Sequence, residues 1–158
     1  MGKIRYTATD PNGFTHTRTS QSRTYSHTVV FQASKDVAVK RAHERLKSDR
    51  SNCEWHARIA STPVEEYVDS EMAKWSHMTR EYVIEGHAEH VATVAAFRGG
   101  SINGEAAAML ADRLAKIEAT DWDIWHNAGW CGRYDLALKL AAGIKNATSV
   151  TILPATAA

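Results

Sequence analysis

Proline and cysteine are scarce in this sequence, and each scarcity excludes some classes of protein. The chain has 3 prolines and 9 glycines among 158 residues, too few for a collagen-like or Pro-rich low-complexity protein. Its two cysteines, Cys53 and Cys131, lie far apart and fit neither a Cys-x-x-Cys motif nor a zinc ribbon. The N-terminus has no apolar signal segment. We therefore expect a cytoplasmic protein with reduced thiols.

Long apolar runs and cofactor motifs are also missing. No run approaches the ~20 apolar residues that a membrane-spanning helix requires, so we expect no membrane partner. The sequence contains no dinucleotide-binding G-x-G-x-x-G, no Walker A loop, no G-x-S-x-G elbow and no paired-carboxylate motif. We therefore expect no cofactor and no bound metal, and the balance is against an enzyme.

Alternation of apolar and polar residues predicts β-structure at the N-terminus. Residues 3–9 alternate, and Asp10-Pro11-Asn12-Gly13 has the residues of a type I turn followed by a left-handed glycine. This turn predicts a hairpin in which Tyr6 lies opposite Arg18. A second alternating run, residues 25–31, predicts a third strand that pairs with the second and places His16 opposite His27.

The outer face of this predicted meander is rich in hydroxyl groups. Threonine suits a half-exposed strand because its β-branch favours the pleat while its hydroxyl stays in water. We interpret the face as a solvated sheet surface. The alternative is a flat hydroxyl array for a sugar, ice or a nucleic-acid backbone.

The middle of the chain predicts helices and one further strand. Ser34 is a good N-cap for a helix, and residues 52–60 alternate as a fourth strand, so residues 24–60 read as a strand-helix-strand unit. Thr62 is expected to cap a helical region over residues 64–97. This region is either one long helix or two helices broken near His77 or Gly86, and we favour the break.

The C-terminal third predicts a second strand-helix-strand unit. Asn103 is expected to cap a helix, followed by a strand over 121–126, a helix over 135–142 and a strand over 149–153. The fold class is therefore α+β. We expect an N-terminal antiparallel β-meander followed by helices and strand-helix-strand units around one core. We predict one domain over residues 1–158, with residues 154–158 as a tail.

Charge is divided unevenly along the chain. Residues 1–60 hold eleven Lys and Arg against five Asp and Glu, and residues 61–158 hold eight against thirteen. In the first part, Lys40, His43, Lys47 and Arg50 recur at helical spacing on one side of the predicted helix. We name these four residues the basic strip and predict that it binds an acidic protein surface or nucleic acid. A solvated helix face is the alternative interpretation.

Two other groups of residues are weaker candidates for a functional site, one for catalysis and one for metal binding. In the Gly- and Cys-containing segment 126–133, Cys131 near a helix N-terminus is a weak candidate nucleophile, with His126 as its base. His87 and His90 have a spacing that allows two metal ligands, but no third ligand follows at a family spacing. We interpret these two histidines as polar positions on a helix face.

Two stretches carry a resemblance to known proteins. His16–Thr19 with Arg23–Val30 resembles the opening of small uncharacterised accessory proteins encoded by tailed bacteriophages, and Gly132–Ala137 resembles a "GR-x-DLA" segment in such proteins. The resemblance implies no activity and no site residue. It implies a context in which accessory proteins bind a host or defence factor.

These observations favour a non-catalytic cytosolic binding protein, phage-encoded, that acts on a host or defence factor through the basic strip. Three alternatives stay open: a nucleic-acid-binding protein, a small enzyme that uses segment 126–133, and a virion or assembly component that forms a homo-oligomer.

Overall fold

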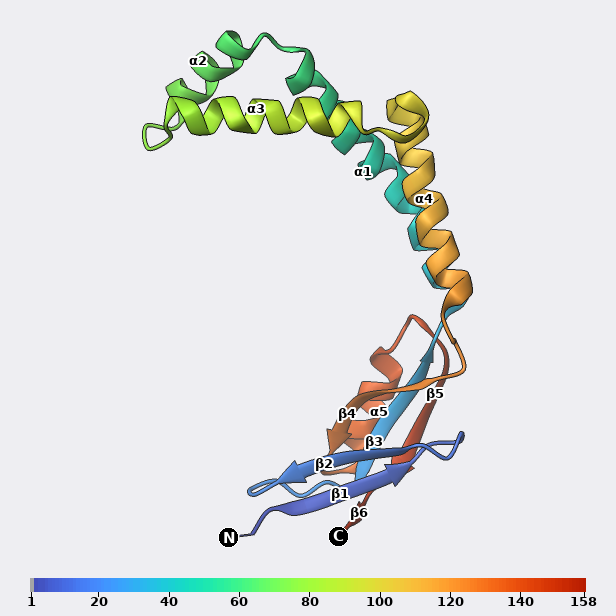
Figure 1. Ribbon diagram of the computed structural model, residues 1–158. Coiled ribbons are helices and arrows are strands. Elements are labelled where there is room, and N and C mark those ends of the chain that lie inside the picture. Colours follow the sequence, from blue (N-terminus) through green and yellow to red (C-terminus); the bar gives the residue numbers. More distant parts are fainter. Residues whose placement is uncertain (1) are drawn as a thin grey trace. The chain divides into compact units, whose positions relative to one another are not determined.

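The computed structural model describes residues 2–158 (Figure 1). Strands and helices are mixed along the chain, which confirms the predicted α+β class. In chain order the elements are β1 (Ile4–Thr9), β2 (Thr15–Ser20), β3 (His27–Ala33), α1 (Lys35–Ser61), α2 (Val64–Lys74), α3 (Arg80–Ala95), the 3-10 turn η1 (Arg98–Gly100), α4 (Ile102–Ala119), β4 (Trp125–Cys131), α5 (Tyr134–Gly143), β5 (Ala147–Pro154) and β6 (Thr156–Ala157).

The chain divides into two compact units. The residues up to Ala38 together with Ala119–Ala158 form the first, which we name the β unit, and Val39–Glu118 form the second, the helical unit. The expected single domain over residues 1–158 stays a prediction.

The first predicted hairpin is confirmed residue by residue. Tyr6 lies opposite Arg18 in the β1–β2 pair, and Gly13 has a φ of 85°, which a glycine adopts without strain. Asp10 holds the turn together, since its carboxylate accepts hydrogen bonds from the backbone N–H of Asn12 at 2.9 Å and of Phe14 at 3.0 Å.

The same buried carboxylate lies 3.0 Å from Nε2 of His16. Burial acts to raise the pKa of Asp10. The hydrogen bonds from His16, Phe14 and Asn12 outweigh burial, and the pKa falls below its ordinary value of 3.8.

The predicted pairing of the second and third strands is wrong. β3 does not pair with β2, so His16 does not face His27. It is instead the middle strand of a second sheet, of order β4-β3-β5, with antiparallel pairing on both sides. Val29 and Val30 on β3 are both fully buried. A strand buried on both faces lies in the interior of its unit and is flanked on both edges, which the alternation at 25–31 did not reveal.

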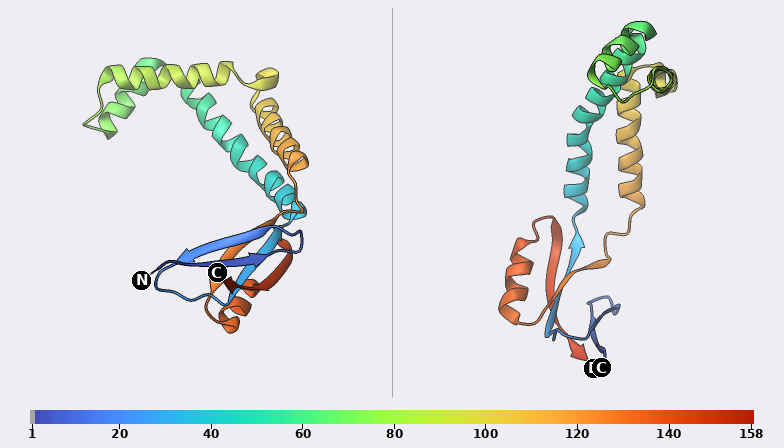
Figure 2. Two further views of the ribbon diagram at one scale, coloured as in Figure 1. Left: turned by 60° about the horizontal axis from the view of Figure 1, so that its bottom comes forward. Right: turned by 90° about the vertical axis from the view of Figure 1, so that its left-hand side faces the viewer.

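The β unit has three layers. α5 lies on one face of the β4-β3-β5 sheet and the β1–β2 hairpin lies on the other (Figure 2). Gly129 on β4 permits the close approach of α5, because a Cβ there would lie 3.0 Å from Leu140 Cδ2.

The predicted 121–126 strand starts too early, since β4 spans Trp125–Cys131. The predicted 135–142 helix and 149–153 strand are confirmed within two residues at each end.

Residues 154–158 are not simply a tail. β6 pairs with β1, so that Thr156 lies opposite Thr7, and this pairing completes a three-stranded sheet of order β2-β1-β6.

In the helical unit, the predicted strand over 52–60 is wrong, because α1 runs on to Ser61. Once a helix is nucleated it propagates until a breaker intervenes, and the first breaker here is Pro63. Thr62 does not cap the following helix, since its hydroxyl donates to the carbonyl of Arg58 at 2.9 Å. The predicted strand-helix-strand unit over 24–60 is therefore absent.

The expected break in residues 64–97 is confirmed near His77, between α2 and α3. α4 begins one residue before the predicted cap Asn103, because the backbone N–H of Gly104 donates to Ser101 Oγ at 2.9 Å instead. An ion pair joins the side chains of α1 and α4: both guanidinium NH2 groups of Arg113 donate to the two oxygens of Asp49, one at 2.9 Å. These hydrogen bonds hold the pKa of Asp49 below its ordinary value despite burial.

Replacement of Asp10 tests the turn. Asp10→Ala leaves the backbone N–H groups of Asn12 and Phe14 and the ring of buried His16 without their acceptor, so we expect the free energy of unfolding in urea at pH 7 to fall by about 1–3 kcal/mol. Because the folded pKa of Asp10 is lowered, its contribution is present above pH 3.8 and is lost as the pH falls through the folded pKa. The difference between wild type and Asp10→Asn should therefore shrink in acid. Glu54→Gln, at an exposed carboxylate, is the matched control, and an equal loss there would contradict this role.

Replacement of Asp49 tests the α1–α4 ion pair. Asp49→Asn removes the charge from a largely buried bidentate pair, and we expect a loss of about 1–3 kcal/mol in urea unfolding at pH 7. The control is Glu44→Gln, which removes the exposed Lys40–Glu44 pair and should cost less than about 0.5 kcal/mol. Equal effects of the two substitutions would show that the buried pair has no special weight.

Candidate binding sites

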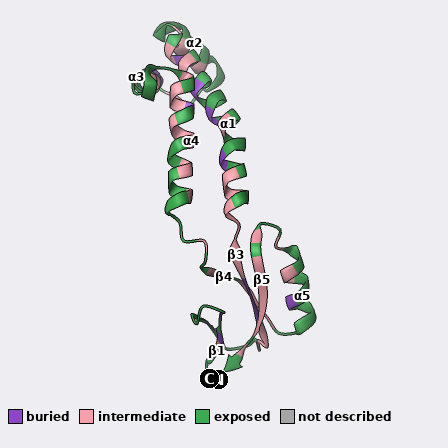
Figure 3. Cartoon of the chain, turned by 90° about the vertical axis from the view of Figure 1, so that its right-hand side faces the viewer, coloured by how far each residue is buried: buried purple, intermediate pink, exposed green. Residues whose placement is uncertain are grey.

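The basic strip forms a continuous exposed face of α1. Lys40, His43, Lys47 and Arg50 all lie on α1 and are all exposed. Ten residues of helix at 1.5 Å each give the strip a length of ~15 Å. The buried residues Ala42, Asp49 and Cys53 share another side of the same helix, about a third of a turn away from the centre of the strip. Figure 3 shows buried positions in purple and exposed positions in green along α1.

The charges of the strip are largely free. Lys40 Nζ lies 3.9 Å from Glu44 Oε1, but both side chains are more than half exposed, so water screens this pair. Within residues 2–158, no carboxylate forms an ion pair with Lys47 or Arg50. The acidic residues of the C-terminal part therefore do not neutralise the strip in the described structure.

The structure does not bring Cys131 and His126 together. Both residues lie in β4 rather than in a loop, and five residues of strand separate them by ~16 Å. His126 packs against Phe31, with ring centroids 5.6 Å apart. Arg133, at the start of α5, pairs with Asp135 at 2.9 Å. The geometry therefore keeps the predicted base, His126, away from the Cys131 thiol, and the residue opposite Cys131 on β3 is His27 instead.

The histidines of the helical unit contact one another in a way that the sequence did not indicate. His56 Nδ1 lies 2.8 Å from His90 Nδ1, and His87 Nε2 donates to the carbonyl of Thr62 at 2.8 Å. Burial, followed by the proximity of His56 and His87, lowers the pKa of His90 below its ordinary value. Over residues 2–158, no three His, Cys, Asp or Glu side chains are grouped so as to hold a metal ion.

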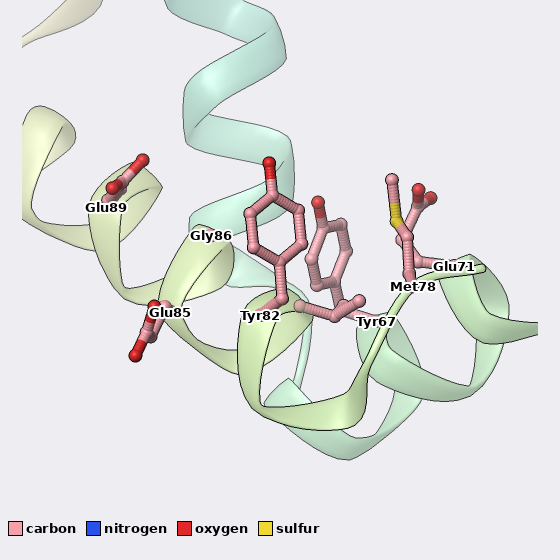
Figure 4. Close-up of a pocket in the computed structure, with 8 residues that line it drawn as sticks. Tyr67, Glu71, Met78, Tyr82, Glu85, Gly86 and Glu89 are labelled. Carbon is pink, nitrogen blue, oxygen red and sulfur yellow. The ribbon is translucent and has the colours of Figure 1, made fainter. Parts of the chain in front are cut away.

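A small pocket lies between α2 and α3 (Figure 4). It has a volume of about 210 Å³ and is lined by tyrosine, methionine and glutamate side chains, among them Tyr67 and Tyr82. Two features limit its negative charge: Glu71 pairs with Lys74 at 2.9 Å, and Glu85 points away from the two tyrosine rings. Glu89 also lines the pocket, so its lining stays acidic and contains no basic side chain.

A larger concavity of about 500 Å³ lies on the β unit, and we name it the arginine pocket. Cationic, aromatic and amide side chains line it from β2, from the β2–β3 connection and from β4; they are Thr17, Arg18, Arg23, Tyr25, Asn127 and Trp130. Sequence reasoning missed this site because its two halves are about a hundred residues apart and meet only through the β3–β4 pairing.

Side-chain contacts fix the walls of the arginine pocket. The Tyr25 ring lies edge-on to buried Tyr6, at 5.2 Å, and to Trp130, at 6.2 Å. The side-chain amide of Asn127 donates to Thr28 Oγ1 at 2.7 Å, and this hydroxyl donates to the carbonyl of Gly129 at 2.8 Å. Because these groups are held, the pocket keeps its form without a ligand.

Within the part of the chain that the structure describes, no helix is long and apolar enough to cross a membrane. Comparison with models of protein families, with curated proteins and with solved structures found no match. The resemblance to phage accessory proteins therefore stays a prediction.

Proposed function

We propose that the protein is a non-catalytic binding protein of the cytosol that docks an acidic protein surface on the basic strip. The observation that carries this proposal is the exposure of all four strip residues along one side of α1, on a different side from its buried residues. A phage-encoded accessory factor that binds a host or defence component fits this proposal, as does a compartment in which Cys53 and Cys131 remain reduced.

The straightness of the strip favours a helical or extended acidic segment as the partner. The strip residues at i, i+3, i+7 and i+10 form a line along one helix, and acidic side chains with the same period on a second helix would lie opposite them. Such an arrangement improves the rate and specificity of association more than its affinity. Binding should therefore weaken steeply as salt increases.

The nucleic-acid alternative keeps one specific observation in its favour, the pair of arginines beside aromatic rings on the β unit. The enzyme alternative has lost support, because the candidate base does not reach the candidate nucleophile. The assembly alternative, a homo-oligomeric virion component, is tested by the mass of the protein in solution.

Two double variants of α1 test the strip. Lys47→Ala with Arg50→Ala removes two strip charges, whereas Arg41→Ala with Arg45→Ala removes two exposed charges from another side of the same helix. Alanine preserves the helix in both. We expect the strip variant to bind a polyglutamate peptide about tenfold more weakly at low salt, a loss of ~1.4 kcal/mol. The flank variant should change the affinity less than threefold.

The probes in this titration are polyglutamate, duplex DNA and single-stranded DNA, each at low and high salt. Salt-sensitive binding of polyglutamate that only the strip variant weakens supports the proposal. Three results would overturn it: equal losses in the two variants, binding to DNA alone, or no binding of any polyanion at low salt.

A further inference from the structure

The arginine pocket holds two cations that no carboxylate of the described chain neutralises. Arg18 and Arg23 both line the pocket and both are exposed, and across residues 2–158 neither forms an ion pair. By contrast, Arg80, Arg98, Arg113 and Arg133 each pair with a carboxylate. Two unpaired guanidinium groups in one concavity form a local site for an anion, and a planar fork suits phosphate oxygens in particular.

The remaining lining groups are suited to a planar, uncharged ring. Tyr25 and Trp130 present aromatic surface beside the two arginines, and neither ring is fully buried. The guanidinium carbon of Arg18 lies 6.0 Å from the centre of the Tyr25 ring, so cation and aromatic surface adjoin. Asn127 uses its amide N–H toward Thr28, and no contact of the described chain occupies its amide oxygen, which can accept a hydrogen bond from a ligand.

We propose that the arginine pocket binds a nucleoside phosphate, either free or as one unit of a single strand. The phosphate lies on Arg18 and Arg23. The base stacks on one of the two aromatic rings, Tyr25 or Trp130, and meets the other at its edge, because the planes of these rings lie at 63° to each other. A volume of about 500 Å³ falls in the range of small-molecule sites. Stacking on aromatic rings together with cationic contact to the backbone is how proteins hold single strands.

Other ligands use only part of this surface. A simple carboxylate or inorganic phosphate would engage the arginines and leave the rings unused. The base pairs of a duplex stack on one another and offer no free face to Tyr25 or Trp130. The pocket lies wholly on the β unit, so this inference is independent of the basic strip on α1.

Tryptophan fluorescence of the full chain tests the proposal. The probes are adenosine monophosphate, adenosine, inorganic phosphate, a ten-nucleotide single-stranded oligothymidine and a duplex of the same length. We expect the nucleotide or the single strand to bind at least tenfold more tightly than adenosine or phosphate alone. Trp130→Phe should remove most of the fluorescence change.

Variants locate the binding. Arg18→Ala with Arg23→Ala should weaken binding at least tenfold, whereas Arg18→Lys keeps the charge without the planar fork and should give an intermediate loss. Arg5→Ala, an exposed arginine on β1 outside the pocket, is the matched control and should change the affinity less than twofold. Thermal unfolding of each variant confirms that it is folded. The double strip variant Lys47→Ala with Arg50→Ala should retain nucleotide binding.

The two sources of the ligand give different outcomes. Binding of the monophosphate without the oligothymidine supports a free nucleotide, and the reverse supports a single strand. The proposal is overturned if neither binds, if only the duplex binds, or if the Arg18 and Arg23 double variant binds as wild type does.

Discussion

The ion pair between Asp49 and Arg113 sets the orientation of α1, and the candidate binding face depends on it. Asp49 shares its side of the helix with buried Ala42 and Cys53, so the contact to α4 turns this side inward. The strip side chains lie between about a quarter and a half of a turn from Asp49 around the helix axis, and all four are exposed. A charged contact is an unusual choice for a buried position, since its desolvation offsets much of its Coulomb energy. The bidentate geometry adds direction to this contact, because both oxygens of Asp49 accept hydrogen bonds from the planar guanidinium of Arg113.

The β unit reaches its geometry by other means. Its central strand is buried on both faces, and the layers on either side are formed by segments from opposite ends of the sequence. The arginine pocket is a by-product of this order, since a loop that follows β2 is brought beside β4. In the helical unit, the basic side chains of the strip lie in a row along α1. In the β unit, arginine and aromatic side chains surround one concavity, the arginine pocket. The first arrangement suits an extended partner and the second a compact ligand.

Local chemistry made part of this structure predictable. The Asp10-to-Gly13 turn and the register of its hairpin follow from residues that contact one another within a few positions, and the basic strip follows from the period of one helix. Strand partners are set by which segments share a core, and the alternation in β3 contains no trace of β4 or β5. The prediction of a strand over residues 52–60 was wrong for a different reason. Alternation over nine residues was a coincidence, and the unbroken helix before them decided their state. The arginine pocket could not be predicted for the same reason, because its two halves meet through the β3–β4 pairing.

The connections of the helical unit have a consequence for how this chain is organised. α1 follows β3 after one residue and α4 leads back to β4, and these two strands pair directly, with Gln32 opposite Trp125. The helical unit is therefore inserted in the chain between β3 and β4, which are neighbours in the sheet. No strand of that sheet comes from the helical unit. A module joined in this way can be lengthened, exchanged or lost while the host sheet retains every one of its strand pairings. The basic strip and the arginine pocket belong to different units, so substitutions in one leave the residues that form the other unchanged.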